Sequence, residues 1–480
     1  MIGRAAGSLL LAVSLFAAGA TAQAAAFADP PAPAAPAAAD TLRLSLDGAV
    51  TRALAEGEEM RAARALVKQA SGQVTVELSR ALPQISGSVV YDRKLESVFQ
   101  GVELDTSSLG SVLKSTPFAA ENTWTAELTA RQLLWSSGKV GSALRAAKAA
   151  KRSASATEAE TATSVTFEVK RAYYDASYAQ RLVDISFRAL EQAREHLRQV
   201  RSGRGQGARS EYDVLRAEVD AANLEPDVVS ARRGRDIALL LLKRLTNVPL
   251  DRPLDLVTPL AFADGLVPVV TERAPSVAQR PALAAADAEV EARGSAVRVY
   301  RGQRWPDLYA STTLQEQAFP GSFLPKFDEF RRNWDAYLTL EIPIFTGRRV
   351  EGEVAQAQSV YDRARAERDR LHEVVAIEAI QARSDLDRSL STLMARSETV
   401  RQAQRAWELA EVRYANGIST QLEVSDARLQ HSTAEVNEAQ AVREYLVALA
   451  NLERAVGRPL SVVRLPLEEA TQTLESEGIR

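Results

Sequence analysis

Two long stretches of the chain carry apolar or small residues at alternating spacings of four and three. The first stripe runs from Val165 to Val200, and the second runs from Ala379 to Tyr414 with Arg396 as its charged exception. Sustained heptads predict helices packed side by side in coiled-coil fashion. A helix from 138 to about 200 would be roughly 90 Å long at 1.5 Å per residue.

Shorter runs alternate with a period of two. In 124–131 and 334–342, apolar residues alternate with polar or charged ones, and the partner runs are 85–91 and 308–314. The two main runs have about the length that a tilted membrane strand needs. Lipid is expected to contact one face, represented by Trp124, Leu128, Trp334, Leu338 and Leu340. A sheet in a soluble protein is the alternative that alternation alone leaves open.

The sequence contains two copies of a similar pattern. The segment NTWTAELTARQLLWSSGKV (122–140) matches NWDAYLTLEIPIFTGRRV (333–350), and KRLTNVPL (243–250) matches ERAVGRPL (453–460). A period of about 210 residues is too long for a solenoid unit and indicates duplication of a whole substructure.

Each copy has the same order of elements: a helix, a strand pair, a long helix, a turn and a returning helix. The first repeat spans 41–250, with strand pair 84–135, long helix 138–201 and returning helix 211–245. A Pro-rich linker at 251–275 leads to the second repeat at 276–460, with strand pair 307–345, long helix 347–415 and returning helix 420–456. A tail follows at 461–480. Pro226 predicts a kink in the first returning helix.

The N-terminus predicts export. Arg4 precedes an apolar run from Ser8 to Ala20, and small residues follow at the expected cleavage position. This pattern is typical of a secretory signal peptide, here 1–24. Residues 25–40 form a Pro/Ala linker that we expect to be disordered. Beyond it, no run approaches the roughly 20 apolar residues of a membrane helix. Any membrane contact is therefore expected from strands.

Both long helices end in similar turns. In VRYANGISTQLEVSDA (412–427), Asn416-Gly417 is typical of a left-handed helix cap, and Ser419 or Thr420 caps the next helix. VRSGRGQGARSEYDVLRA (200–217) has the same layout, with Gly205 in the place of Gly417. These segments are predicted to be the tips of two helical hairpins.

Composition excludes several classes of function. The 480 residues include 25% charged residues with a net charge of −3, so nothing indicates a nucleic-acid binder, and cysteine is absent. His196, His372 and His431 lack ligand spacing and are interpreted as solvated surface residues. Phosphate-binding and nucleophile motifs are absent as well. We therefore expect neither an enzyme nor a cofactor or metal site.

Four strands cannot close a barrel, because the smallest single-chain membrane barrels need about eight. Open strand edges are not tolerated in lipid. Several copies of the chain are therefore expected to share one barrel.

Residues 41–460 resemble the TolC-type family, the outer membrane factors of bacterial efflux pumps and type I secretion systems. LTLEIPIFTGRRV is similar to that family's junction between strand and long helix, and YANGISTQLEVSDA to its periplasmic turn. The resemblance implies a mainly α fold with a transmembrane β-barrel portion. Three copies would form a twelve-stranded barrel, continued by a twelve-helix α-barrel in the periplasm of a Gram-negative bacterium. The first and last helices of each repeat would stack end to end.

The resemblance also assigns roles at the tips. Tyr414 corresponds to a tyrosine that holds the closed state, and Glu423 and Asp426 stand where the family has carboxylates around the pore. Such a ring favours cations and is strained by mutual repulsion. The alternative for Glu423 is simple stabilisation of a helix N-terminus. The implied contacts with a periplasmic adaptor are Gly205, Glu211, Asp213, Val214, Gly417, Gln421 and Leu422. The first turn is richer in glycine and arginine than the family pattern, and Leu133 stands where the second repeat has Pro343.

The leading hypothesis is an exit duct of a tripartite efflux system. It would move small molecules or drugs outward, and a periplasmic adaptor (membrane fusion) protein would couple it to an inner-membrane transporter. The first alternative is the exit duct of a type I protein secretion system. A soluble coiled-coil scaffold and a general porin or adhesin are more distant alternatives. The duct sequence does not specify the cargo.

Overall fold

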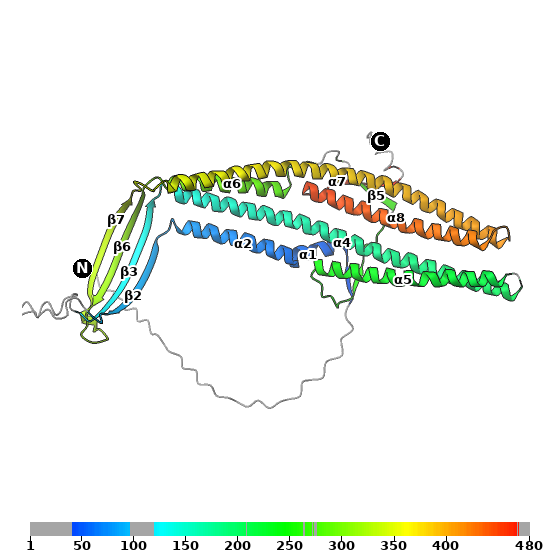
Figure 1. Cartoon of the computed structure of the whole chain (residues 1–480), viewed down its shortest axis with the longest axis horizontal. Coiled ribbons are helices and arrows are strands. Elements are labelled where there is room, and N and C mark those ends of the chain that lie inside the picture. The colour runs from blue at the N-terminus through cyan, green and yellow to red at the C-terminus, as the bar shows by residue number, and fades with distance from the viewer. Residues whose placement is uncertain are drawn as a thin grey trace, which may run out of the picture.

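A computed structural model describes residues 41–96, 120–207, 209–262, 265–270, 272, 276–467 and 469. The predicted signal peptide, the Pro/Ala linker and most of the loop at 94–121 lie outside these residues. The model joins one four-stranded sheet to a long bundle of helices (Figure 1).

The sheet has the order β2-β3-β6-β7, and every neighbouring pair is antiparallel. Its strands are β2 (Gln84–Arg93), β3 (Asn122–Trp135), β6 (Asp307–Ala318) and β7 (Arg331–Glu341). A short helix, η2 (Phe327–Glu329), lies in the β6–β7 connection. The β3–β6 pairing joins the two repeats, so the sheet is a single unit formed by both halves of the chain.

Strand register places the predicted lipid-facing residues on one face. Leu128 pairs with Leu314, which pairs with Trp334, and Gly87 completes that row on β2. Residues two positions apart along a strand share a face. The same face therefore carries Ile85, Val89, Tyr91, Trp124, Ala126, Ala130, Leu308, Ala310, Thr312, Ala336, Leu338 and Leu340. Polar residues such as Glu127, Arg131 and Asp335 lie on the other face.

Two helices run the length of the molecule. These are α4 (Lys139–Gly205) and α7 (Arg349–Ala415), and each has 67 residues. The predicted stripe of α4 is buried or half-buried along its whole length, with Val169 and Ala176 fully buried. On α7, Ala382, Leu386 and Leu393 are buried, whereas Arg396 is exposed as its charge requires.

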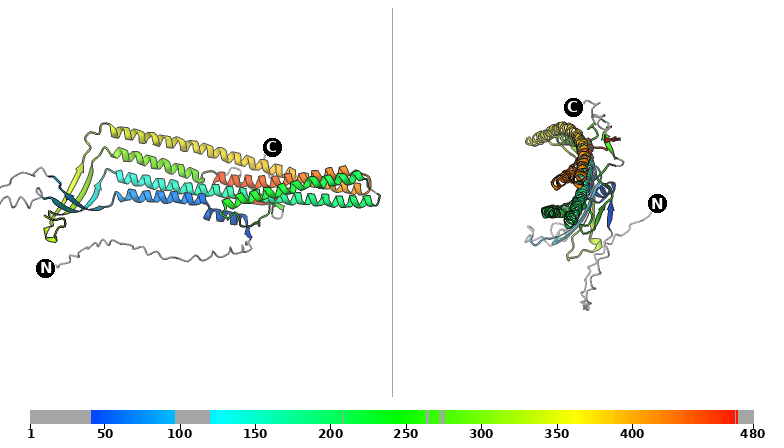
Figure 2. Two further views of the ribbon diagram at one scale, coloured as in Figure 1. Left: turned by 60° about the horizontal axis from the view of Figure 1, so that its bottom comes forward. Right: turned by 90° about the vertical axis from the view of Figure 1, so that its right-hand side faces the viewer.

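Shorter helices complete each row. Near the sheet, α2 (Glu58–Ser79) lies on α4, and α6 (Pro281–Gly302) lies between α4 and α7. Toward the other end, α5 (Glu211–Leu245) continues the line of α2, and α8 (Gln421–Val456) continues the line of α6 (Figures 1 and 2). Pro226 lies inside α5, which is one continuous helix in the structure. Viewed along the long axis, the helices form a curved wall (Figure 2).

The junctions from strand to long helix have the same backbone in both repeats. Ser137 and Gly138 have positive φ values of 52° and 78° before α4, and Gly347 and Arg348 have values of 59° and 64° before α7. Left-handed backbone is unfavourable for residues with a Cβ atom, so each junction uses one glycine. Lys139 and Asp307, 2.6 Å apart, tie the start of α4 to the start of β6.

The middle of the molecule carries two small sheets. Strand β1 (Leu42–Leu44) pairs with β4 (Leu254–Leu256), and β5 (Leu266–Val270) pairs with β8 (Val462–Pro466). The fully buried Tyr173 of α4 donates to Leu44 O at 3.0 Å and accepts from Thr258 N at 2.9 Å. Tyr445 of α8 donates to Pro268 O, and burial raises the pKa of this phenol. One tyrosine therefore anchors each small sheet.

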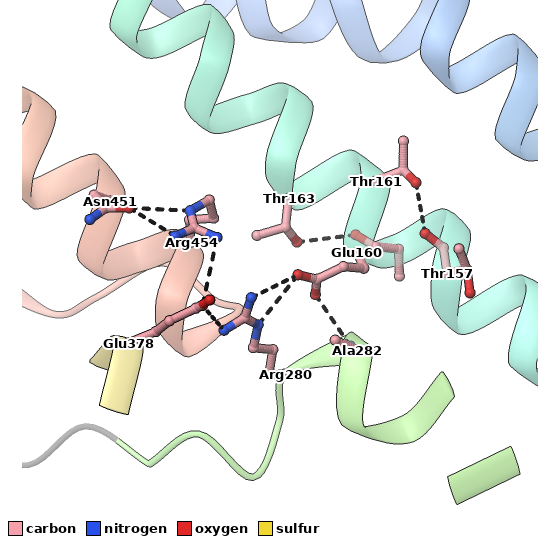
Figure 3. A network of polar contacts seen from close by, with 10 residues as sticks. Thr157, Glu160, Thr161, Thr163, Arg280, Ala282, Glu378, Asn451 and Arg454 are labelled. Carbon is pink, nitrogen blue, oxygen red and sulfur yellow. Dashed lines mark hydrogen bonds and ion pairs between the residues drawn. The ribbon is translucent and has the colours of Figure 1, made fainter. Parts of the chain in front are cut away.

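A buried cation joins four helices where α8 meets α6 (Figure 3). Arg280, whose side chain is 7% exposed, contacts Glu160 of α4 at 3.2 Å and Glu378 of α7 at 2.6 Å. Glu160 also accepts from the backbone N–H of Ala282, and Arg454 of α8 lies 3.9 Å from Glu378. The network fixes the junction of α6 and α8 against both long helices.

The first helix differs from its prediction. The sequence pattern suggested one helix at about 45–80, opened by Ser45. Ser45 Oγ does accept from Gly48 N, but the helix divides into α1 (Leu46–Glu56) and α2 at Gly57. A Cβ at this position would lie 2.3 Å from Ala53 O, so only glycine fits. Within the described residues, none of the helices is both long and apolar enough to cross a membrane.

Candidate functional site: the hairpin tips

The first turn connects α4 to α5. Gly205 is the last residue of α4, and the left-handed position is Gly207, with φ of 74°. The sequence pattern placed Gly205 in the position of Gly417, and this is wrong for the backbone: Gly207 has the left-handed conformation that Gly417 has. Ser210 caps α5, because its hydroxyl accepts from Asp213 N at 3.2 Å and the Asp213 carboxylate accepts from Ser210 N at 3.0 Å. This capping box fixes the direction of the returning helix.

The second turn connects α7 to α8. Gly417 has φ of 73°, and Ile418 N donates back to Arg413 O at 2.9 Å, which is the expected cap for a left-handed glycine. Thr420 caps α8 by accepting from Glu423 N at 3.4 Å. The Glu423 carboxylate lies 3.8 Å from the Arg413 guanidinium. Glu423 is thus exposed in the first turn of α8 and paired across the tip.

Tyr414 contacts two side chains that come from the first hairpin. Arg209 of the first turn lies over the tyrosine ring, with its guanidinium carbon 4.1 Å from the ring centroid. His196 of α4 has its ring centroid 5.7 Å from that of Tyr414. Tyr414 is half-buried, and burial raises the pKa of its hydroxyl. The residue assigned to the closed state therefore makes one of the contacts between the two hairpins.

A groove of about 490 Å³ opens beside this contact, between α4, α5 and α8. Asp426 lines it together with Asp220 and Arg428. Ser425 donates to Asp220 at 2.8 Å, and Arg428 lies 4.0 Å from the same carboxylate. Within one subunit, Asp426 thus faces a groove between helices, while Glu423 is directed to the tip.

The residues predicted to contact the adaptor differ in how exposed they are. Glu211, Gly417 and Leu422 are exposed, and Asp213 is half-buried in its capping box. Val214 and Gln421 are each 5% exposed, so in this conformation they pack inside the subunit and offer no surface. Gln421 follows the capping residue Thr420, and Val214 follows Asp213 of the capping box. Both therefore lie in the first turn of a returning helix, which directs them inward. Their exposed apolar neighbours are Tyr212, Leu215 and Ile418.

Two histidines were misinterpreted from the sequence. His196 is half-buried against Tyr414, and His431 of α8 is half-buried and stacked on Trp407 with ring centroids 5.3 Å apart. His372 alone has the exposure that was expected. No period identified these contacts, because each joins two different helices. Within the described residues, there is no group of three or more histidine, aspartate or glutamate side chains that could hold a metal ion.

The family model for outer membrane efflux proteins matches residues 49–248 and 276–458, which are the two repeats.

The chain belongs to the outer membrane efflux protein family.

Individual relatives agree with this result. The chain is 24% identical over 426 residues to the pyoverdine export outer membrane protein OpmQ of Pseudomonas aeruginosa, covering 86% of this chain and 85% of that protein. It is 25% identical over 305 residues to the outer membrane protein TolC of Escherichia coli, covering 61% and 59%. Among solved structures, the CmeC outer membrane channel of Campylobacter jejuni has a TM-score of 0.69 at 18% identity, covering 90% of this chain and 89% of that chain. This last likeness concerns the fold.

The family places the protein in the outer membrane of a Gram-negative bacterium, with the helices in the periplasm. It is a family of efflux proteins and not a class of enzymes. The predicted membership of the TolC-type outer membrane factor family is confirmed.

Proposed function

We propose that three copies of this chain form a continuous duct through the outer membrane and serve as the exit of a tripartite efflux system. The sheet carries the argument. It has an apolar face and two edge strands, β2 and β7, each of which pairs with only one strand among the residues that the structure describes. Open edges are not tolerated in lipid. Pairing β7 of one copy with β2 of the next removes them, and three four-stranded sheets make a ring of twelve strands.

The helices support the same symmetry. In the half distant from the sheet, α5 packs on α4 at one side of the curved wall, and α7 packs on α8 at the other. Both outer helices expose large apolar side chains: Tyr212, Leu215, Val219, Val229, Ile237, Leu240 and Leu241 on α5, and Val374, Ile377, Ile380, Leu409 and Val412 on α7. Different surfaces that meet head to tail close into a cyclic ring. In such a ring the apolar sides of α5 and α7 would be covered by the neighbouring copies, and the space enclosed by the ring would be filled with water.

We assign the tips to gating and to contact with a periplasmic adaptor. The groove between α4, α5 and α8 is lined in part by the exposed Leu429, and Leu422 of the same helix is also exposed. These features suit an apolar helical hairpin rimmed by charges. Tyr414 would hold the tip closed, and Glu423 and Asp426 of three copies would line the mouth. An inner-membrane transporter would deliver cargo through the adaptor. Small molecules are the favoured cargo, because one relative is named for pyoverdine export.

The assembly has a matched test. Leu338 lies on the apolar face of β7 and is 70% exposed, and Thr339 follows it on the polar face. Leu338→Arg places a charge in lipid, which costs about 2–4 kcal/mol per copy near the membrane midplane. We expect Leu338→Arg to abolish a detergent-resistant trimer in outer-membrane extracts and Thr339→Arg to preserve it. Equal amounts of trimer from both variants would contradict a lipid-facing sheet.

Conduction is tested separately. Purified wild-type protein in planar bilayers should give single-channel currents with a preference for cations. Replacing Glu423 and Asp426 by Gln and Asn should reduce that preference while current remains. A wild-type protein that forms trimers without conducting would contradict the duct.

A further inference from the structure

The contact of His196, Arg209 and Tyr414, here called the tip latch, contains polar atoms that are buried without a partner. His196 Nε2 and Tyr414 Oη make no hydrogen bond within the described part of the chain. A buried donor or acceptor without a partner is unfavourable, because it has given up its hydrogen bonds to water. The tip latch is therefore held by packing and by the Arg209 guanidinium stacked on Tyr414. Exposing the unpaired His196 and Tyr414 atoms to water would remove the cost of burying them.

The charges around His196 oppose its protonation. Burial is the main cause that lowers the pKa of this imidazole, and the guanidinium groups of Arg428 on α8 and Arg209 in the first turn lower it further. Asp220 of α5 acts in the other direction, but that carboxylate already accepts from Ser425 and lies beside Arg428. On α7 the neighbours are Tyr414, which stays neutral, and Glu411, which interacts with Arg428. On α4 itself, Glu195 is paired with Arg198.

The three members of the tip latch come from different segments. His196 and Arg209 belong to the first hairpin, and Tyr414 belongs to the second. A proton on His196 adds a third cation to a half-buried site that already holds Arg209 and Arg428. Separation of the hairpins exposes the imidazole to water and increases its distance from the Arg428 guanidinium of α8. Protonation and opening therefore favour each other.

We propose that His196 is a proton sensor at the periplasmic tip, and that its protonation releases Tyr414 and opens the duct when the periplasm is acidified. The proposal rests on the duct function proposed above. In the closed tip the imidazole pKa is below its ordinary value of about 6.5. The stability that neutral His196 gives to the closed tip is complete above that ordinary value. It is lost as the pH falls from there through the lowered pKa.

The test is the open probability of single channels in planar bilayers at pH 7.5 and pH 5.5. For the wild type we expect a several-fold increase at the lower pH. His196→Gln, which cannot be charged, should show little change, and His196→Lys, which is charged at both pH values, should be open at both. His372→Gln removes an exposed histidine of α7 and should respond like the wild type.

One further variant separates the latch from the carboxylates at the mouth. Because Glu423 and Asp426 also gain protons in acid, the doubly neutral Glu423→Gln/Asp426→Asn protein should keep the wild-type pH response. A full pH response in His196→Gln, or loss of the response in the carboxylate variant, would overturn the sensor. If the wild type conducts but its open probability is independent of pH, the sensor fails and the duct stands. Complete absence of current would instead count against the duct.

Discussion

Trp124 and Trp135 lie on the same face of β3, although an odd number of positions separates them. Trp124 is paired with Ala318 and Trp135 with Leu308, and the register shifts between Leu133 and Trp135. In a regular strand this spacing would direct the two indoles to opposite faces. A β-bulge at Leu134 therefore returns Trp135 to the apolar face, so that a tryptophan lies at each end of the apolar band.

The bulge predicts the effect of a deletion. Removing Leu134 takes out the extra residue, so Trp135 follows Leu133 directly, keeps its pairing with Leu308 and stays on the apolar face. We therefore expect the deletion protein to form as much trimer in the outer membrane as the wild type, measured by quantitative blotting of unheated extracts. Trp135→Ser removes the aromatic anchor itself and should give less trimer. A loss of trimer in the deletion protein as large as in Trp135→Ser would contradict the role assigned to the bulge.

Tyr173 is expected to stabilise the middle of the molecule through its hydroxyl. Tyr173→Phe leaves Leu44 O and Thr258 N without this partner, and the loss should be about 1–3 kcal/mol. The melting temperature of the detergent-solubilised trimer measures this. Tyr178→Phe is the control, because its half-buried ring makes no hydrogen bond within the described residues and should leave the melting temperature unchanged. Equal melting temperatures for both variants would contradict the role assigned to Tyr173.

Arg280 is predicted to matter more than an exposed arginine. Arg280→Gln leaves the Glu160 and Glu378 carboxylates near one another without the cation. Breaking a fully buried pair costs about 3–5 kcal/mol, and the partial exposure of Glu378 places this loss at about 3 kcal/mol or below. Arg152, whose pair with Glu291 is more than half exposed, is the control, and Arg152→Gln should change stability by less than about 1 kcal/mol. Chemical denaturation of both variants decides the comparison.

Gly457 is expected to tolerate no side chain. It ends α8 with φ of 82°, and a Cβ atom there would lie 2.8 Å from Arg280 Cα. Gly457→Ala combines left-handed strain of about 1–2 kcal/mol with a clash against backbone, so it should cost more than the strain alone. Gly352→Ala, in an open position of α7, should be neutral or stabilising by up to about 1 kcal/mol. Denaturation midpoints measure both, and a smaller loss for Gly457→Ala would mean that the joint can shift.

Much of the architecture follows from periodicity. The heptad stripes of α4 and α7 predicted long helices packed side by side, and alternation around Trp124 and Trp334 predicted strands with one apolar face. Both patterns report a local geometry in which every third or fourth residue, or every second one, faces the same neighbour. Capping residues such as Thr420 also act over three positions, so the start of the second returning helix could be predicted from the sequence.

The remaining features depend on contacts between distant segments. The break at Gly57 was missed because a glycine within a helical pattern does not reveal that its neighbours exclude a Cβ atom. The pairing of β5 with β8 was also missed, since the linker and the tail show no repeat. At the tips, the burial of Val214 and Gln421 depends on how α5 and α8 pack, and the sequence pattern did not indicate it.

The sequence by itself determined the duplicated order of helices and strands, since hydrophobic period and capping chemistry are properties of neighbouring residues. Only the tertiary structure decided that His196 and Arg209 both lie against Tyr414, and that Arg280 lies between carboxylates of α4 and α7. These side chains are far apart along the chain, and their energies depend on burial and distance in the folded state, which no local pattern records.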